Sequence, residues 1–177
     1  MEYLDKDWSN LKLFVLLAND DSPFKVVIKN VILIMYEMAK MGYYHCDIKP
    51  ENIMVNHVTL KVKFIDFEDL YFNKSSNPSH IAPFTGTIGF RSPESYGKKP
   101  FDLLSSLVFN IGCVLYFCYE TQTASKSVES LIGICTKIKP HERIKFHNLL
   151  FHEWFNYETE SFSCVRLLYN LWTKYFK

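Results

Sequence analysis

The most informative stretch of the sequence reads His45-Cys46-Asp47-Ile48-Lys49-Pro50-Glu51-Asn52, and Asp66-Phe67-Glu68 follows fourteen residues after Asn52. Two carboxylates, an amide and a lysine in such loops are the groups that phosphoryl transfer needs. One carboxylate orients a hydroxyl, the other holds Mg²⁺ together with the amide, and the lysine offsets charge on the moving phosphoryl group. Any one of these residues alone would be read as a surface charge or a turn former.

The combination of motifs resembles the protein kinases. The first stretch is similar to the kinase catalytic loop, and its sequence Lys49-Pro50-Glu51 is of the serine/threonine type. Further motifs follow in the order of the family: Phe64–Glu68 resembles the Asp-Phe-Gly segment, Gly86–Glu94 the end of the activation segment, and Pro140–Ile144 with Leu149–Phe155 the late Pro-x-x-Arg and His-x-Trp-Phe signature. Within the family, the residues of these motifs show a weak preference for the Pim-like and calcium/calmodulin-dependent groups.

The resemblance implies a role for each site residue. Asp47 would be the catalytic base, and Lys49 would contact the γ-phosphate of ATP. Asn52 and Asp66 would bind Mg²⁺ and thereby the nucleotide, and Thr87 would brace the catalytic loop. Outside the site, the resemblance implies a buried ion pair between Glu94 and Arg143.

The expected fold is mainly α with a small β-hairpin, a kinase-like C-lobe without the β-rich N-lobe. Residues 1–157 are assigned to this lobe, with a hinge at Met1–Leu4, and residues 158–177 to an amphipathic helical tail. Apolar spacing and stop signals predict an exposed loop over 73–83, a hairpin of Ile53–Val55 with Val62–Ile65, and helices over Lys25–Met41, Ser105–Tyr119, Val128–Lys139, Lys145–Phe155 and Phe162–Lys177.

Composition excludes several other classes of protein. The net charge of +1 gives no field to gather nucleic acid or an anionic membrane. The apolar run Phe101–Tyr119 is short for a bilayer span and contains polar residues, so it is expected to be a core helix. Five cysteines without metal or disulfide spacing, and a start without a secretory signal, predict a reducing compartment, the cytoplasm or the nucleus.

Several departures from the family pattern concern activity. If the hinge lies at residue 1, the glycine-rich loop and the phosphate-binding lysine of the N-lobe are absent. Glu68 replaces a glycine, which brings a charge near the metal site and is expected to strain a backbone with positive φ. Cys46 replaces the arginine that pairs with an activation-loop phosphate, and Leu107 replaces a helix aspartate that anchors the catalytic loop. The stretch from Glu120 to Glu129 is shorter than the family's substrate-docking segment.

Two functions remain open from the sequence. The preferred one is a non-autonomous kinase-like protein that binds or regulates another protein kinase or a kinase N-lobe, since a bare C-lobe should expose apolar surface around the cleft. The alternative is an active serine/threonine kinase that phosphorylates a protein substrate with ATP and Mg²⁺, its N-lobe supplied in trans or by a longer chain. The survival of Asp47, Lys49, Asn52 and Asp66 together supports the alternative.

Overall fold

The computed structural model describes residues 4–17, 21–73, 79–80, 86–97, 99–120 and 124–155. Its α-helices are α1 (Leu11–Leu17), α2 (Asp21–Lys40), α3 (Leu103–Tyr119) and α4 (Lys126–Cys135), and its strands are β1 (Trp8–Asn10), β2 (Tyr43–His45), β3 (Ile53–Asn56), β4 (Val62–Phe64), β5 (Leu70–Phe72), β6 (Ser79–His80) and β7 (Phe101–Asp102). Short 3₁₀ turns cover Pro50–Asn52, Pro93–Tyr96, Pro140–Glu142, Phe146–Phe151 and Glu153–Phe155. The expected helix-rich fold with small antiparallel sheets is confirmed.

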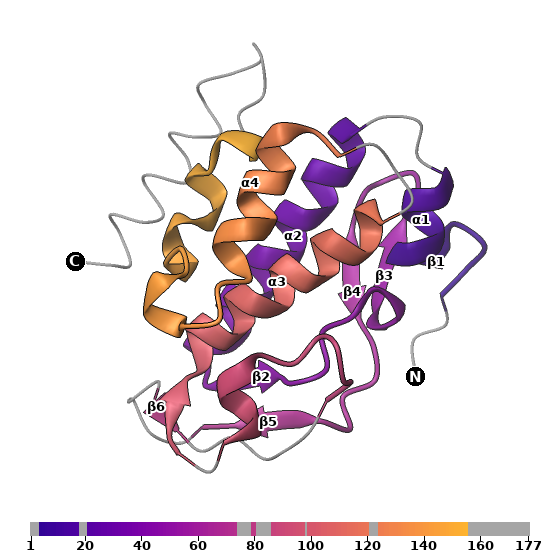
Figure 1. Ribbon diagram of the computed structural model, residues 1–177. Helices are drawn as coiled ribbons and strands as arrows, with labels where there is room; N and C mark the ends of the chain where they lie inside the picture. The colour runs from indigo at the N-terminus through magenta and orange to yellow at the C-terminus, as the bar shows by residue number, and fades with distance from the viewer. Residues whose placement is uncertain are drawn as a thin grey trace.

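Helices α2, α3 and α4 form the body of the molecule, and α3 contacts both of the others (Figure 1). Helix α2 ends where Gly42 takes a φ of 83°, a conformation that glycine adopts without a steric penalty. The carboxylate of Asp102 caps the start of α3 by accepting the backbone N–H of Leu104 at 3.0 Å. Helix α3 is buried on most sides, as its sequence predicts. Among the described residues no helix combines the length and apolar content that a membrane span requires.

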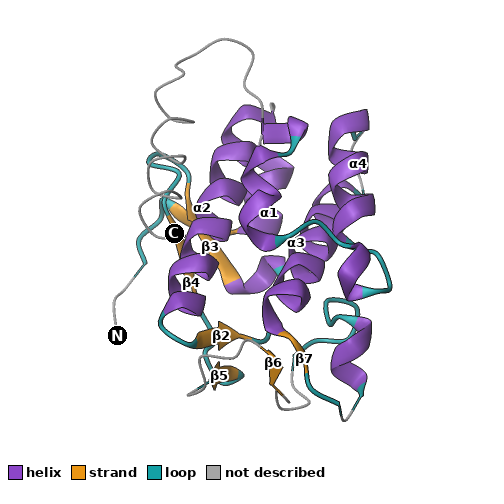
Figure 2. Ribbon diagram, turned by 90° about the vertical axis from the view of Figure 1, so that its left-hand side faces the viewer, coloured by secondary structure: helices purple, strands orange, loops and turns teal. Residues whose placement is uncertain are grey.

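The strands form three small antiparallel units, ordered β1-β3-β4, β2-β5 and β6-β7. The predicted hairpin is confirmed: Ile53 pairs with Phe64 and Val55 with Val62. Strands β3 and β4 lie beside α2, whereas β2, β5, β6 and β7 gather at one end of the helices (Figure 2). Strand β1, helix α1 and the β2-β5 ribbon are elements that the sequence prediction did not include.

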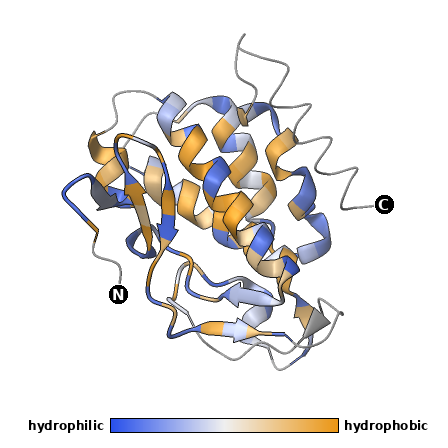
Figure 3. Ribbon diagram, turned by 180° about the vertical axis from the view of Figure 1, so that it is seen from behind, coloured by the Kyte–Doolittle hydropathy of each residue, from blue (hydrophilic) through white to orange (hydrophobic). Residues whose placement is uncertain are grey.

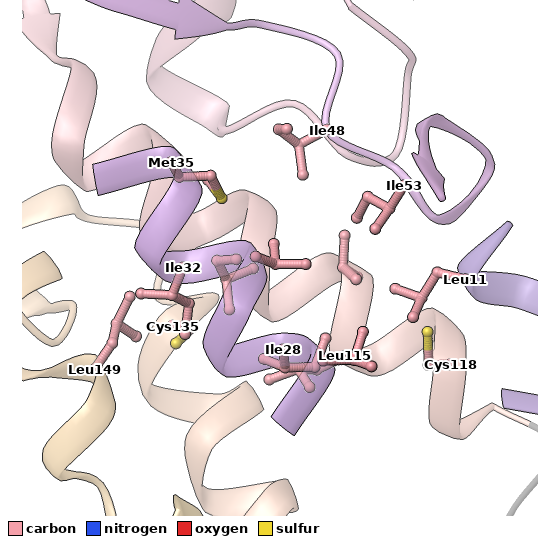
Figure 4. Packing of buried hydrophobic residues seen from close by; sticks show 14 of the residues in the cluster. Leu11, Ile28, Ile32, Met35, Ile48, Ile53, Leu115, Cys118, Cys135 and Leu149 are labelled. Carbon is pink, nitrogen blue, oxygen red and sulfur yellow. The ribbon is translucent and has the colours of Figure 1, made fainter. Parts of the chain in front are cut away.

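Hydrophobic residues concentrate on the packed helices (Figure 3) and form one buried cluster. Ile48 and Ile53, which flank the segment containing Lys49 and Asn52, are fully buried. Figure 4 shows both side chains reaching into the cluster that contains Met35 of α2 and Leu115 of α3. The catalytic-loop stretch is therefore fixed to the helices by two apolar side chains, one on each side of Lys49 and Asn52.

Two predicted helices are shorter or tighter than expected. Helix α4 ends at Cys135 rather than Lys139, and the carbonyls of Lys137 and Ile138 just beyond it accept hydrogen bonds from the Arg143 guanidinium. The predicted helix over Lys145–Phe155 is a pair of 3₁₀ turns, in which Asn148 N–H donates to Lys145 O at 2.8 Å and Phe155 N–H to His152 O at 2.9 Å.

Some predictions fall outside the described residues. The hinge at Met1–Leu4 is described only at Leu4, and the loop 73–83 only at Asn73 and at strand β6. The tail 158–177, the domain boundary at residue 157 and the helix predicted over Phe162–Lys177 lie outside the described ranges and stay predictions.

Candidate active site

Asp47 is the centre of the candidate site. Its side chain is nearly buried and accepts hydrogen bonds from Lys49 Nζ at 2.6 Å, from the Thr87 backbone N–H at 2.7 Å and from Asn52 Nδ2 at 3.0 Å. Lys49 Nζ also donates to Thr87 Oγ1 at 2.8 Å, and Asn52 Nδ2 to the Asp47 backbone carbonyl at 2.9 Å. Four of the five predicted site residues thus form a single hydrogen-bonded network, and Thr87 enters it from 40 residues further along the chain.

The network fixes the charge of its two ionisable groups. Burial by itself would raise the pKa of Asp47, but the hydrogen bonds from Lys49 and Thr87 outweigh burial and hold that pKa below its ordinary value. The hydrogen bond to Asp47 raises the pKa of Lys49, and the nearby charges of Asp66 and Glu51 add to this shift. Asp47 is therefore an ionised acceptor at neutral pH, and Lys49 is a cation.

His45 connects the catalytic loop with the segment that carries Asp66. Its Nε2 lies 3.0 Å from the carbonyl oxygen of Ile65, and its Nδ1 accepts the Asp47 backbone N–H at 3.3 Å. The carbonyl can only accept, so the two contacts together require the neutral Nε2–H tautomer. The Ile65 backbone N–H donates to the Asn52 backbone carbonyl at 3.1 Å, which ties the residue before Asp66 to the end of the catalytic loop.

Asp66 differs from Asp47 in its surroundings. It is exposed, its backbone φ is 62°, and it lies close enough to Lys49 to affect the lysine pKa. The expected backbone strain at Glu68 is wrong, because the left-handed conformation in this segment belongs to Asp66, a residue type that tolerates it better than most. The replacement of glycine by Glu68 therefore introduces charge without a strained backbone.

Asn52 and Asp66 suit a magnesium ion by their donor chemistry. Asn52 uses Nδ2 on Asp47, which leaves its amide oxygen as the atom for a metal, and Asp66 presents an exposed carboxylate. Carboxylate and amide oxygens are the hard ligands that Mg²⁺ takes, usually only one or two of them beside water and phosphate. In the described part of the chain no three His, Cys, Asp or Glu side chains cluster as a separate metal centre.

The end of the activation-segment stretch is fastened to the catalytic loop by Gly86. This residue has a φ of 91°, and a Cβ added to it would clash with the carbonyl oxygen of Cys46. Its backbone N–H donates to Asp69 Oδ2 at 3.2 Å, and the N–H of Cys46 donates to Asp69 O at 3.3 Å. The sequence prediction missed Asp69 because its side-chain partner is 17 residues away and no local pattern marks such a contact.

The predicted ion pair between Glu94 and Arg143 is present in bidentate form. The two guanidinium nitrogens lie 2.6 and 2.7 Å from the two carboxylate oxygens, and the Arg143 side chain is fully buried. Its remaining donors reach the carbonyls of Lys137, Ile138 and Ser105. Leu107, at the position of the expected anchoring aspartate, is buried among apolar residues and contributes no charge to the loop.

Comparison with known proteins shows which family the chain belongs to. The family model of the protein kinase domain matches residues 1–123. The chain belongs to the protein kinase family. Members of this family transfer phosphate from ATP with Mg²⁺, and the site of this kinase chain lies within the matched residues.

Its curated relatives are serine/threonine kinases and a probable dual-specificity kinase. "Serine/threonine-protein kinase cds1" of Schizosaccharomyces pombe is 25% identical and aligns with 79% of this chain and 38% of its own length. "Serine/threonine-protein kinase 1" of African swine fever virus (strain Badajoz 1971 Vero-adapted) is 24% identical over 88% of this chain and 57% of the viral protein. The "probable dual specificity protein kinase YAK1 homolog" of Encephalitozoon cuniculi is 28% identical over 62% of this chain and 26% of the relative. The chain thus spans between about a quarter and somewhat over half of these relatives.

Proposed function

We propose that this chain supplies the catalytic-loop side of a serine/threonine kinase site and transfers phosphate when it is paired with a kinase N-lobe. The observation that carries the proposal is the convergence of Lys49, Thr87 and Asn52 on Asp47 within 3.0 Å. Desolvated and paired groups of this kind are costly to assemble for stability alone. They are preorganised for a reaction in which positioning and electrostatics supply most of the rate.

Each residue has a defined part in the proposed reaction. Asp47, ionised and fixed, accepts a hydrogen bond from the substrate serine or threonine hydroxyl, orients its oxygen toward the γ-phosphorus and takes the hydroxyl proton as the new oxygen–phosphorus bond forms. Lys49 offsets negative charge on the phosphoryl group as the bond to the β-phosphate oxygen breaks. When bound by Asn52 and Asp66, Mg²⁺ would supply further neutralisation of the phosphate charge.

The surface beside Asp66 supports pairing with an N-lobe. In kinases the glycine-rich loop and the lysine that holds the phosphates belong to that lobe, on the same polypeptide or on another. Ile65 and Phe67, on either side of Asp66, are 38% and 49% exposed. Exposed apolar side chains at the edge of a site are typical of a surface that binds another protein.

The proposal is tested by joining the chain to an N-lobe. The N-lobe of the S. pombe relative is fused ahead of residue 1, and transfer of the γ-phosphate of labelled ATP to casein is measured. We expect transfer that is abolished by Asp47→Asn and retained by Glu129→Gln, a matched loss of an exposed carboxylate on α4. A folded fusion that binds Mg²⁺-ATP and yet transfers no phosphate would contradict the proposal.

The 177 residues by themselves give the complementary measurement. Micromolar affinity for Mg²⁺-ATP at millimolar concentration would stabilise the fold by about 4 kcal/mol through mass action. We expect the melting temperature of the 177 residues to change little with Mg²⁺-ATP and that of the fusion to rise. A large rise for the 177 residues that Asp66→Asn removes would show that no N-lobe is needed for binding.

A second candidate function is regulation of another kinase by binding alone. The negative charge of Glu68, two residues from Asp66, favours it, because a carboxylate near the site repels the phosphates of ATP, which the family glycine would not do. Under this candidate the chain co-purifies from cells with a protein kinase, and the double variant Ile65→Ser/Phe67→Ser loses that kinase. Ile138→Ser, which changes a 76% exposed side chain after α4, serves as the matched control.

A further inference from the structure

We propose that Asp69 is a positioning residue that holds Thr87 against the catalytic loop without any covalent modification of the chain. The inference rests on the proposed phosphoryl transfer, in which Thr87 contacts Asp47 and Lys49. Among the described residues, Asp69 forms no hydrogen bond with either of these two. It acts through Gly86, the residue next to Thr87 in the chain.

The backbone of Asp69 is fixed on the catalytic-loop side. It lies in the turn that Leu70 N–H closes on Phe67 O at 3.1 Å, one residue before strand β5. Its carbonyl accepts the Cys46 N–H at 3.3 Å, and the next pair, Leu70 with His45, is in register in the β2-β5 ribbon. The position of this backbone is thus tied to that of His45 and Cys46, immediately before Asp47.

The side chain of Asp69 reaches across to the activation-segment stretch. An aspartate in a turn commonly accepts a backbone N–H one or two residues further along. Here the carboxylate accepts the N–H of Gly86, 17 residues away, at 3.2 Å. One residue thus connects three parts of the site: the catalytic loop by its carbonyl, the Asp66–Glu68 segment by its turn, and Thr87 by its carboxylate.

The other end of the Thr87 turn is fixed from α3. Phe90 N–H closes the turn on Thr87 O at 3.2 Å, and the Phe90 carbonyl accepts Asn110 Nδ2 at 2.5 Å. Asn110 is itself buried in the helix. Residues 86–90 are therefore held at both ends, by Asp69 and by Asn110, and the Thr87 N–H and hydroxyl between the two anchors face Asp47 and Lys49.

Glycine at position 86 is required by this arrangement. With a φ of 91° and the Cys46 carbonyl against its Cα, the residue brings its N–H to Asp69 while its backbone passes the catalytic loop at contact distance. A side chain would push the two segments apart. The Asp69 contact therefore acts at the closest approach of the two segments, where a small displacement moves Thr87 directly.

Amide hydrogen exchange tests the proposal without any need for activity. In Asp69→Ala we expect the Gly86 and Thr87 amides to exchange about tenfold faster, since a hydrogen bond that orders the segment is lost. Asp69→Asn keeps an oxygen acceptor and should stay near the wild-type rate. Glu68→Ala, which removes an exposed carboxylate from the same turn, controls for charge.

The pattern of exchange separates positioning from general support of the fold. A positioning role predicts faster exchange at Gly86 and Thr87 with the β2-β5 amides of Tyr43 and Phe72 unchanged. Equal acceleration in the ribbon, or none at Gly86 and Thr87, would overturn the proposal. If Asp69→Ala does not fold, the wild-type protein decides the question, because a Gly86 amide that exchanges at the unprotected rate carries no such bond.

The fusion described above adds a kinetic readout. There Asp69→Ala should lower kcat about tenfold with the KM for ATP unchanged, and Asp69→Asn should restore kcat. Inactivity of the wild-type fusion together with the expected exchange pattern would reject the proposed function and leave the Asp69 contact standing. A normal kcat in Asp69→Ala would reject the positioning role alone.

Discussion

The catalytic loop and the Asp66–Glu68 segment each bring a carboxylate to the same site, yet they are built in opposite ways. Asp47 is 6% exposed and is held by donors from Lys49, Thr87 and Asn52. The three residues of the Asp66–Glu68 segment are all exposed. The catalytic loop is thus packed and hydrogen-bonded within the described residues, whereas the Asp66–Glu68 segment is exposed. The predictions below test this difference through stability.

The largest effect is expected for the buried Glu94–Arg143 pair. It lies outside both regions and serves as a standard for the cost of losing a buried charge contact. Arg143→Met leaves Glu94 without its partner in a buried place and should lower the free energy of unfolding by about 3–5 kcal/mol. Chemical denaturation measures this change. Lys139→Met breaks the exposed pair of Lys139 with Glu142, 3.1 Å apart, and should cost less than about 1 kcal/mol. Similar losses of unfolding free energy in both variants would mean that burial does not determine how much each ion pair contributes to stability.

The next effect contrasts the two carboxylates directly. Asp47→Ala removes the acceptor of three donors and should destabilise the protein by about 2 kcal/mol. Asp66→Ala, in the open segment, should change the unfolding free energy by no more than about 0.5 kcal/mol. The comparison fails if urea denaturation gives the two variants equal stability.

Acid should weaken the catalytic loop by protonating Asp47. The pKa of Asp47 is lowered in the folded protein, so its contribution to stability is present above its unfolded pKa of about 3.9 and is lost as the pH falls through the folded value. We therefore expect the stability difference between wild type and Asp47→Asn to shrink below about pH 4. A difference that stays constant between pH 6 and pH 3 would contradict the lowered pKa.

The smallest effects concern the backbone of the open segment. Asp66→Gly should stabilise the fold by about 0.5–1 kcal/mol because it relieves a left-handed φ of 62°. Glu68→Gly, although it restores the family residue, should be neutral or destabilising by about 0.5 kcal/mol because no such φ is relieved. The melting temperatures of the two variants test this expectation. A stabilisation of Glu68→Gly alone would show that the strained backbone lies at Glu68 and not at Asp66.

Sequence predicted the parts of the molecule that depend on local pattern or on family motifs. Helices α2 and α3 and the β3-β4 hairpin follow from apolar spacing, and Asp47, Lys49, Asn52 and Thr87 follow from the kinase resemblance. The structure brings these four residues together in one hydrogen-bonded network. The resemblance also implied the Glu94–Arg143 pair, whose members lie 49 residues apart.

Tertiary contacts explain what sequence could not predict. The carbonyls of Lys137 and Ile138, just beyond the end of α4, bind Arg143, which comes from further along the chain. The location of positive φ at Asp66 rather than Glu68 is a property of the folded backbone. The link from Asp69 to Gly86 joins residues whose spacing follows no helical or strand period.

The burial of Ile48 and Ile53, on either side of Lys49 and Asn52, has a thermal consequence. Apolar contacts weaken on cooling because the hydrophobic driving force decreases at low temperature. Ionic strength does not screen them, since salt screens only charges. In this kinase-family chain the part of the loop's attachment that comes from the two isoleucines should therefore persist in concentrated sodium chloride and weaken near freezing, the reverse of what an electrostatic contact would do.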